Sequence, residues 1–235
     1  MAFQKVVKFI QETPDTITLR IKLDKPMSFK CGQFVMLGLN LDKKGATKLV
    51  KRAYSIASPP TKPDTIDITI KIYDKGELSP HLNRLKAGDI VDVLGPYGAF
   101  VFEENVPHDV VLIAAGAGIT PLMSIIRYVK DKGLSKKIKM LYSSKTPTDI
   151  IYYDEIVGLG KTLHGFSCDF TITRPSGFDW KGMTGRISKG MIQECMKSSH
   201  DPVFYLCGPP DMINGTVAIL LDLGVPKERI KKEEW

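Results

Sequence analysis

The sequence predicts two domains: a six-stranded antiparallel β-barrel over residues 1–105 and an α/β domain with a mostly parallel sheet over residues 106–235. Two observations support this prediction. In the first half, apolar and polar residues alternate with a period of two, which is typical of strands with one buried face. In the second half, continuous apolar runs alternate with segments of helical spacing, which favours parallel strands covered by helices.

Six segments of the first half have the strand pattern. Isoleucine occupies every second position from Ile66 to Ile72, with polar residues between. Turns that contain Pro or Gly separate the segments, as at 58–60 and 95–98. A closed barrel is expected because closure removes exposed sheet edges. The expected strands are 6–12, 17–23, 33–39, 50–57, 66–72 and 90–94.

The fourth expected strand contains Arg52-Ala53-Tyr54-Ser55 near its end. The arginine is a permanent planar cation suited to a phosphate. The tyrosine ring is suited to stacking, and the serine hydroxyl can both donate and accept a hydrogen bond. Taken alone, the stretch favours an ordinary edge strand with a surface arginine and a half-buried tyrosine.

A short helix is expected over 79–85, with Ser79 as N-cap and Pro80 as the first helical residue. The segment 76–79, Gly-Glu-Leu-Ser, leads into it. Glycine permits close approach of the backbone, and free N–H groups at a helix start attract phosphate. This turn and the Arg52 strand together could grip a pyrophosphate from two sides, although alone the turn is equally a simple helix cap.

The second half begins with a strand, a glycine turn and a helix. The apolar run 110–115 is followed by Gly-Ala-Gly-Ile-Thr-Pro at 116–121 and by helical spacing over 122–129. This order sets helix N–H groups against a phosphate. Pro121 stands where the six-residue Gly-x-Gly-x-x-Gly fingerprint has its third glycine, so a plain tight turn is the alternative.

Strands and helices then continue to alternate. The turns at 116–121, 143–146, 173–174 and 207–209 follow expected strands, and they should share one rim because ligands of parallel sheets bind at the carboxyl ends of strands. The expected strands are 110–115, 139–143, 169–173 and 203–207, and the expected helices are 122–129, 150–159, 188–196 and 211–223.

Charge and cysteine content limit the class of protein. The net charge of +7 favours phosphorylated ligands or acidic protein partners, whereas nucleic acid is disfavoured because no dense Lys/Arg block with aromatic residues occurs. The four cysteines form no Cys-x-x-Cys pair, which disfavours a metal site. Neither a signal peptide nor a membrane span is expected, so the cytoplasm is the expected compartment.

Four motifs therefore occur in a fixed order: Arg-x-Tyr-Ser at 52–55, Gly-x-x-Ser at 76–79, Gly-x-Gly-Ile-x-Pro at 116–121 and Cys-Gly-Pro-Pro at 207–210. In this order and in its two domains the sequence resembles the ferredoxin–NADP reductase superfamily. It is most similar in kind to compact flavoprotein reductases that use FAD and NAD(P)H and lack a fused iron–sulfur module.

The resemblance implies that the barrel is the FAD-binding domain. Arg52 would bind the flavin pyrophosphate, Tyr54 would pack against the isoalloxazine ring, and Ser55 would lie near flavin N5. The other residues implied around the flavin are Ala53, Lys71 and Tyr73, the phosphate-facing Gly76, Leu78 and Ser79, and the terminal Trp235 as a cover of the outer flavin face. A frayed chain end is the alternative for Trp235.

The resemblance also implies that the second domain binds NAD(P). Cys207 would face the nicotinamide, and Glu233 would occupy the place of an acid linked to proton delivery, so that Ser55, Cys207 and Glu233 would be catalytic. A core methionine and a charged tail are the alternatives for Met212 and Glu233. The other implied contacts are Gly116, Gly118, Thr120 and Pro121 at the pyrophosphate, and Gly208, Pro209 and Met212 near the nicotinamide.

NADPH is favoured slightly over NADH. Ser144 and Lys145 stand at the second strand end and Arg174 at the third, and hydroxyls with cations suit a 2′-phosphate. Asp149 either contacts a ribose or starts a helix. FAD is favoured over FMN, since both phosphate-binding motifs are present.

The function expected is hydride transfer from NAD(P)H to FAD, with electrons passed on to a ferredoxin, a cytochrome or an oxygenase component. A redox protein would be the partner, and the basic charge favours an acidic, ferredoxin-like one. The alternatives are an electron-transfer subunit of a larger complex and a non-catalytic nucleotide-binding regulatory module.

Overall fold

The computed structural model describes residues 3–43 and 45–234. The chain forms two compact units. Unit 1 comprises Met1–Phe102 and Met123–Tyr128, and unit 2 comprises Glu103–Leu122 and Val129–Trp235.

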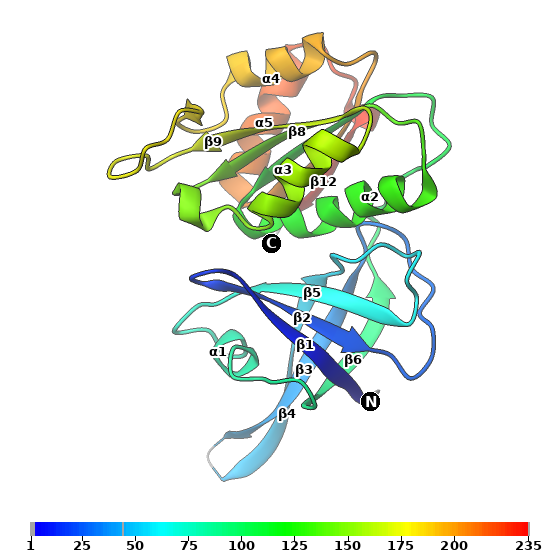
Figure 1. The fold of residues 1–235 in the computed structure, drawn as a ribbon, viewed down its shortest axis with the longest axis vertical. Coiled ribbons are helices and arrows are strands. Elements are labelled where there is room, and N and C mark those ends of the chain that lie inside the picture. The colour runs from blue at the N-terminus through cyan, green and yellow to red at the C-terminus, as the bar shows by residue number, and fades with distance from the viewer. Residues whose placement is uncertain (1–2, 44, 235) are drawn as a thin grey trace. The chain divides into compact units, whose positions relative to one another are not determined.

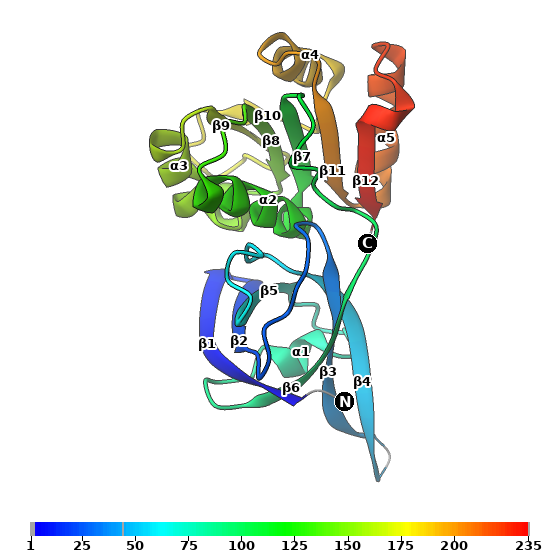
Figure 2. The same ribbon diagram turned by 90° about the vertical axis from the view of Figure 1, so that its right-hand side faces the viewer.

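Unit 1 is built on a six-stranded antiparallel sheet with the order β4-β3-β6-β1-β2-β5 (Figures 1 and 2). An isolated bridge between Ile56 and Ile68 joins the chain just after β4 to β5, so the two end strands of the sheet approach each other. The six predicted strands are confirmed. Their bounds are β1 Phe3–Thr13, β2 Thr16–Lys22, β3 Phe34–Lys43, β4 Ala46–Ser55, β5 Thr65–Lys71 and β6 Ile90–Tyr97.

The core of unit 1 is set by pairs of apolar residues across β2 and β5. All six residues of these pairs are completely buried. Cross-strand pairs of this kind fix the register, because a slip by one residue would turn every apolar side chain to the opposite face. The pairs are Ile17 with Ile70, Leu19 with Ile68, and Ile21 with Ile66.

The predicted helix 79–85 is wrong in its length and its cap. Helix α1 spans only Ser79–Leu82, and Leu78 is its N-cap without a side-chain cap hydrogen bond. The Ser79 hydroxyl instead accepts a hydrogen bond from the Tyr73 N–H at 3.1 Å and donates to the Tyr73 carbonyl at 3.4 Å. This hydroxyl therefore closes the preceding turn and is not available to cap the helix.

Unit 2 is a parallel sheet with the order β10-β9-β8-β7-β11-β12 (Figure 2). Helices α2 and α3 cover one face of the sheet and α4 and α5 cover the other, as the two ribbon views show. The strands are β7 Val110–Ala115, β8 Ile138–Ser144, β9 Phe166–Ile172, β10 Met183–Thr184, β11 Val203–Gly208 and β12 Ile230–Glu234. The helices are α2 Ile119–Lys132, α3 Tyr153–Thr162, α4 Lys189–Lys197 and α5 Pro210–Asp222.

The carboxyl ends of the central strands are level with one another. Ala114 pairs with Cys207, Ala115 pairs with Ser143, and Ser144 pairs with Ile172. The expected common rim of strand ends is therefore confirmed within unit 2.

Strand β12 was not predicted, because the tail 230–234 carries four charged residues and only one apolar residue. It pairs in parallel with β11 at the edge of the sheet, and Glu233 stands opposite Cys207. An edge strand is held by backbone hydrogen bonds and tolerates charged side chains, so an apolar pattern is not required there.

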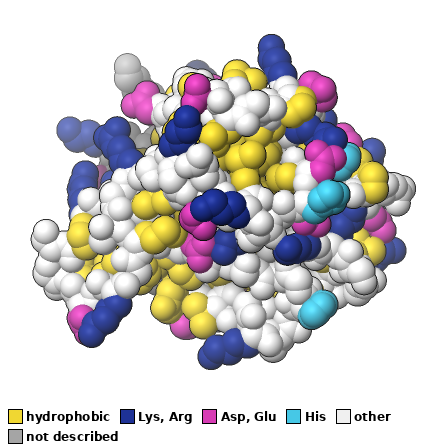
Figure 3. Space-filling model, turned by 90° about the horizontal axis from the view of Figure 1, so that it is seen from above, with side chains coloured by type: hydrophobic (Ala, Val, Ile, Leu, Met, Phe, Trp, Pro, Cys, Tyr) yellow, Lys and Arg dark blue, Asp and Glu magenta, His cyan; other side chains and the backbone are white. Residues whose placement is uncertain are grey.

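Charged groups of both signs are mixed on one face of the molecule. On the face shown in Figure 3, Lys and Arg side chains are interspersed with acidic and apolar side chains. Among the described residues no helix is long and apolar enough to cross a membrane. Within that same part of the chain, no group of three His, Cys, Asp or Glu side chains could hold a metal ion, and all four cysteines are free thiols.

Candidate functional site

Strand β4 places Arg52 beside the turn that precedes α1. The Arg52 guanidinium forms an ion pair with the carboxylate of Glu77 and donates a hydrogen bond to the Lys51 carbonyl at 2.8 Å. The Arg52 side chain is 54% exposed. The two sequence motifs that were expected to grip a phosphate together are thus neighbours, and the cation in this arrangement is accessible.

Tyr54 is half-buried and packs against the barrel core. Burial raises the pKa of its phenol to about 12, an effect that the positive charge of Arg52 opposes and that Tyr73 reinforces. The hydroxyl therefore stays neutral at ordinary pH. Tyr54 presents an uncharged ring close to Arg52 and Tyr73, which suits packing against a flat aromatic ligand.

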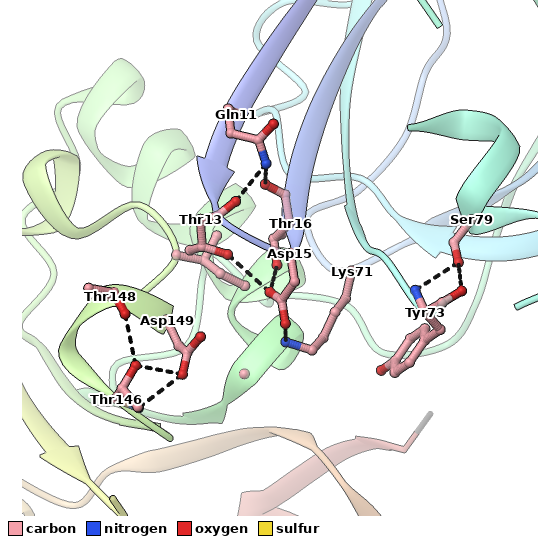
Figure 4. A network of polar contacts seen from close by, with 12 residues as sticks. Gln11, Thr13, Asp15, Thr16, Lys71, Tyr73, Ser79, Thr146, Thr148 and Asp149 are labelled. Carbon is pink, nitrogen blue, oxygen red and sulfur yellow. Dashed lines mark hydrogen bonds and ion pairs between the residues drawn. The ribbon is translucent and has the colours of Figure 1, made fainter. Parts of the chain in front are cut away.

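The turn from Tyr73 to Ser79 is closed by hydrogen bonds (Figure 4). The Gly76 N–H donates to the Tyr73 carbonyl at 2.7 Å. A Cβ added at Gly76 would lie 2.6 Å from the Ser79 hydroxyl oxygen and 2.9 Å from the Tyr73 carbonyl oxygen. Since Leu78 is buried and the Ser79 hydroxyl is engaged, the turn offers a ligand mainly its backbone.

Lys71 is held in a separate polar network (Figure 4). Its ammonium group forms an ion pair with Asp15 at 2.6 Å, and the hydroxyls of Thr13 and Thr16 donate to the same carboxylate. Burial by itself raises the pKa of Asp15, but the hydrogen bonds from Lys71 and the two threonines outweigh it and leave that pKa below its ordinary value. Lys71 thus ties β5 to the β1–β2 turn, a contact the sequence did not indicate.

In unit 2 the glycine turn lies against the end of β11. Gly116 has a left-handed backbone with φ of +54°, and the Thr120 hydroxyl donates to the Ala117 carbonyl at 2.7 Å. A Cβ added at Gly118 would lie 2.1 Å from the Cys207 carbonyl oxygen and 2.7 Å from the Gly208 nitrogen. Only glycine permits this approach, which brings the start of α2 against the Cys207-Gly208 backbone.

Cys207 and Glu233 share the rim of the sheet. Cys207 is buried at the end of β11, and Glu233 stands opposite it in β12. Burial raises the pKa of the Glu233 carboxyl above its ordinary value. Glu233 is therefore a partly buried residue of an ordered strand, and its role in proton delivery stays a prediction.

Behind the rim, Met212 packs against the core of unit 2 and accepts a hydrogen bond from the Thr216 hydroxyl at 3.5 Å. Its terminal methyl would lie 2.5 Å from a Cβ added at Gly208. Pro209 is the N-cap of α5, which begins at Pro210. The Met212 side chain therefore packs between the core of unit 2 and the Gly208 backbone.

The loops after β8 and β9 are joined to each other. The Arg174 N–H donates to the Lys145 carbonyl at 2.7 Å, and the Thr173 N–H donates to the Ser144 carbonyl at 3.0 Å. Both Lys145 and Arg174 are exposed, whereas Ser144 is buried. Two cations therefore occupy adjacent loops at the same rim.

Asp149 is occupied within its own turn (Figure 4). Its carboxylate accepts hydrogen bonds from the Thr146 N–H at 3.0 Å and from the Thr146 hydroxyl at 2.7 Å, which closes the short helical turn Pro147–Asp149. Asp149 is the last residue of this turn, and α3 begins only at Tyr153. The expectation that Asp149 starts a helix is therefore not met, and its contact with a ribose stays a prediction.

The structure gathers the expected site residues into two groups. In unit 1, Arg52, Tyr54 and Tyr73 lie close together near the 76–79 turn, with Ala53 and Ser55 on the same strand. In unit 2, the glycine turn, Cys207, Gly208 and Glu233 meet at one rim. Trp235 lies outside the described residues. Sequence reasoning missed Glu77, because an ion-pair partner leaves no pattern in the sequence.

Two family models match the chain. The first, described as an oxidoreductase FAD-binding domain, matches residues 4–102, and the second, described as an oxidoreductase NAD-binding domain, matches residues 112–218. The two matches fall on the barrel and on the parallel-sheet unit in the expected order. The predicted FAD-binding and NAD(P)-binding character of the two halves is therefore confirmed.

Known proteins match over nearly the whole chain. NADH-cytochrome b5 reductase 1 of Pyricularia oryzae is 30% identical over 89% of this chain and 70% of its own length. The glycine betaine monooxygenase reductase subunit of Chromohalobacter salexigens is 30% identical over 98% of this chain and 63% of its own length. The structure of the CS-b5R domains of human Ncb5or in an NAD⁺ form aligns with a TM-score of 0.86 and 28% identity, covering 98% of this chain and 68% of that one.

Proposed function

Because the chain belongs to the ferredoxin–NADP reductase-like family of NAD(P)H-dependent FAD reductases, we propose that it takes a hydride from NAD(P)H onto FAD and passes the electrons to a protein redox acceptor. One observation carries the proposal. Each unit holds a site suited to a pyrophosphate, namely Arg52 beside the 76–79 turn in unit 1 and the 116–121 turn against Cys207 in unit 2.

The unit 1 site fits FAD. It presents an accessible guanidinium, the backbone of the 76–79 turn and the neutral ring of Tyr54. Arg52 binds the pyrophosphate by charge-assisted hydrogen bonds, Tyr54 packs on the ring system, and Ala53 and Ser55 border it. The bound FAD supplies the centre that accepts a hydride and releases electrons singly.

Other residues of unit 1 support this site indirectly. Tyr73 borders the ring system, while the Ser79 hydroxyl keeps the Gly76 turn closed through the Tyr73 backbone. Lys71 acts from the ion pair with Asp15, where it orders the strand that leads to Tyr73. The protein's contribution at this site is binding and orientation, since the flavin carries out the chemistry.

The unit 2 site fits the nicotinamide coenzyme. Gly116, Gly118, Thr120 and Pro121 form the turn at the start of α2, whose N–H groups attract a pyrophosphate. Cys207 and Gly208 border the nicotinamide, with Pro209 and Met212 fixing the backbone behind them. Glu233 holds a proton more readily than an exposed glutamate, because burial raises its pKa, and it is placed beside Cys207.

NADPH is the preferred coenzyme in this proposal. Ser144, Lys145 and Arg174 lie on two joined loops at the rim, and Asp149 is engaged by Thr146. Replacing Lys145 and Arg174 together by alanine should lower kcat/KM for NADPH about 10- to 100-fold, because hydrogen bonds to charged groups contribute about 1.5–3 kcal/mol. The value for NADH should remain unchanged.

The matched control is the Lys161→Ala/Arg186→Ala pair, which removes two exposed cations of unit 2 outside these loops. Steady-state kinetics with both coenzymes measure the effect. Equal losses for NADPH and NADH in the Lys145/Arg174 variant would refute a 2′-phosphate site.

The acceptor is proposed to be an acidic protein, such as a ferredoxin-like one. The relatives are named as reductases of cytochrome b5 and as reductase subunits of monooxygenases, and this chain has a net charge of +7. Opposite charges steer association, and salt weakens that steering. The monooxygenase reductase subunits also favour a second candidate, an electron-transfer subunit of a larger complex. This chain spans 63% of the length of the Chromohalobacter salexigens reductase subunit. Four free thiols fit a reducing compartment such as the cytoplasm.

The function is tested by loading the purified protein with FAD and supplying NADPH and ferricyanide. We expect both electrons of each hydride to appear as reduced ferricyanide. With an acidic redox protein as acceptor, the rate should fall as salt increases, while the ferricyanide stoichiometry should stay the same. A protein that binds both nucleotides and oxidises no NAD(P)H would be a regulatory module and not a reductase.

A further inference from the structure

Tyr142 connects β8 to the glycine turn. Its side chain is 0% exposed, and its ring lies 6.2 Å from the ring of Phe170. Its hydroxyl donates a hydrogen bond to the Gly116 carbonyl at 3.0 Å and accepts one from the Ile151 N–H at 3.3 Å. All four residues belong to unit 2. Because the buried Tyr142 hydroxyl both donates and accepts a hydrogen bond, its position is fixed.

Gly116 needs such a support. Its backbone is left-handed and it has no side chain that packing could hold, and even a Cβ built there would meet no atom within 4 Å. Its carbonyl also accepts from the Ile119 N–H at the end of the turn Gly116–Gly118. In a trans peptide the N–H points opposite to the C=O. Holding the Gly116 carbonyl toward Tyr142 therefore turns the Ala117 N–H away from Tyr142.

We propose that Tyr142 is a positioning residue for the nicotinamide coenzyme, whose hydroxyl holds the Gly116 peptide so that the N–H groups of the turn are aligned for the pyrophosphate before it binds. The inference rests on the proposed function and deepens it. Alignment of the N–H groups before binding strengthens the binding, because the turn then loses less conformational entropy when the coenzyme binds. Burial raises the pKa of the Tyr142 phenol far above its ordinary value, so the hydroxyl keeps the proton that it donates.

The chain offers a matched control in Tyr205. This tyrosine lies in β11 of the same sheet, which β7 separates from β8. Its side chain is 1% exposed, and its hydroxyl accepts a hydrogen bond from the Glu103 N–H at 3.2 Å. Tyr142→Phe and Tyr205→Phe therefore remove the same buried hydroxyl, and only the first removes a bond to the glycine turn.

We expect Tyr142→Phe to raise KM for NADPH about 3- to 10-fold, the effect of losing the hydrogen bond to the Gly116 carbonyl, with kcat at saturating NADPH within about twofold of wild type. The Kd for NADP⁺ should rise by the same factor, whereas the Kd for adenosine 2′-monophosphate, which has no pyrophosphate, should not change. Tyr205→Phe should leave all of these constants unchanged. Isothermal titration and steady-state kinetics on the FAD-loaded protein give the values.

Two results would overturn the inference. One is an unchanged NADP⁺ affinity in Tyr142→Phe. The other is an equal loss of NADP⁺ and of adenosine 2′-monophosphate binding, which would indicate general loosening of unit 2. If wild-type protein oxidises no NADPH although it binds NADP⁺, the proposed function fails, and the comparison of the two Kd values still tests Tyr142.

Discussion

Gly118→Ala is expected to reduce the rate of flavin reduction by NAD(P)H more than 100-fold while flavin stays bound. The added Cβ would lie 2.1 Å from the carbonyl oxygen and 2.4 Å from the carbonyl carbon of Cys207. These are backbone atoms of β11, so neither side can move without displacing the glycine turn or the strand end. Overpacking of this kind commonly costs about 1–3 kcal/mol of stability. Anaerobic stopped-flow measurement of flavin reduction gives the rate.

Gly158→Ala provides the control for this prediction. Gly158 lies in α3, where an added Cβ would meet nothing within 4 Å. Alanine is the better helix former by about 1 kcal/mol, so this variant should reduce flavin normally and unfold at an equal or higher temperature. Dithionite should still bleach the flavin of Gly118→Ala, because that reaction needs no coenzyme. Normal coenzyme kinetics in Gly118→Ala would contradict the close packing of the turn on Cys207.

Arg52→Ala is expected to weaken FAD binding at least about 10- to 100-fold. The guanidinium is the accessible cation of the unit 1 site, and hydrogen bonds to charged groups contribute about 1.5–3 kcal/mol. The substitution also leaves the Glu77 carboxylate without the cation that it pairs with, so a negative charge would face the incoming pyrophosphate. Fluorescence titration of the flavin-free protein with FAD measures the Kd.

Glu77 makes this prediction specific. In the Arg52→Ala background, Glu77→Gln should recover part of the lost affinity, because it removes the repelling charge. Arg84→Ala, which removes another exposed arginine of unit 1, should leave the Kd unchanged. Equal FAD affinity in Arg52→Ala and Arg84→Ala would show that Arg52 does not bind the pyrophosphate.

The fold was predictable where burial sets the pattern. The alternation of Ile66, Ile68 and Ile70 predicts a strand, and the apolar run 110–115 predicts a strand buried on both faces. The alternation did not reveal that Asp67 and Thr69 are buried as well. Both elements are found where they were expected. The glycine turn was predictable as well, because Gly116 and Gly118 meet separate requirements that alanine cannot meet, namely a left-handed backbone and close approach to Cys207.

Features that depend on partners distant in sequence were not predictable. Strand β12 forms because β11 has a free edge with which it can pair. The charged sequence of the segment 230–234 gives no sign of this pairing. Ser79 has the residue type of an N-cap, but its hydroxyl is taken by Tyr73. The same limit applies to the candidate site, since residue types indicated Arg52 and Cys207, whereas Glu77 and Tyr142 become evident only through their contacts.

The most direct test of the reductase function is an anaerobic titration of the FAD-loaded protein with NADPH, followed by its yellow flavin absorbance. We expect stoichiometric NADPH to bleach the flavin completely and ferricyanide to restore the colour. Flavin that stays yellow in excess NADPH and in excess NADH, yet is bleached by dithionite, would contradict the proposed hydride transfer.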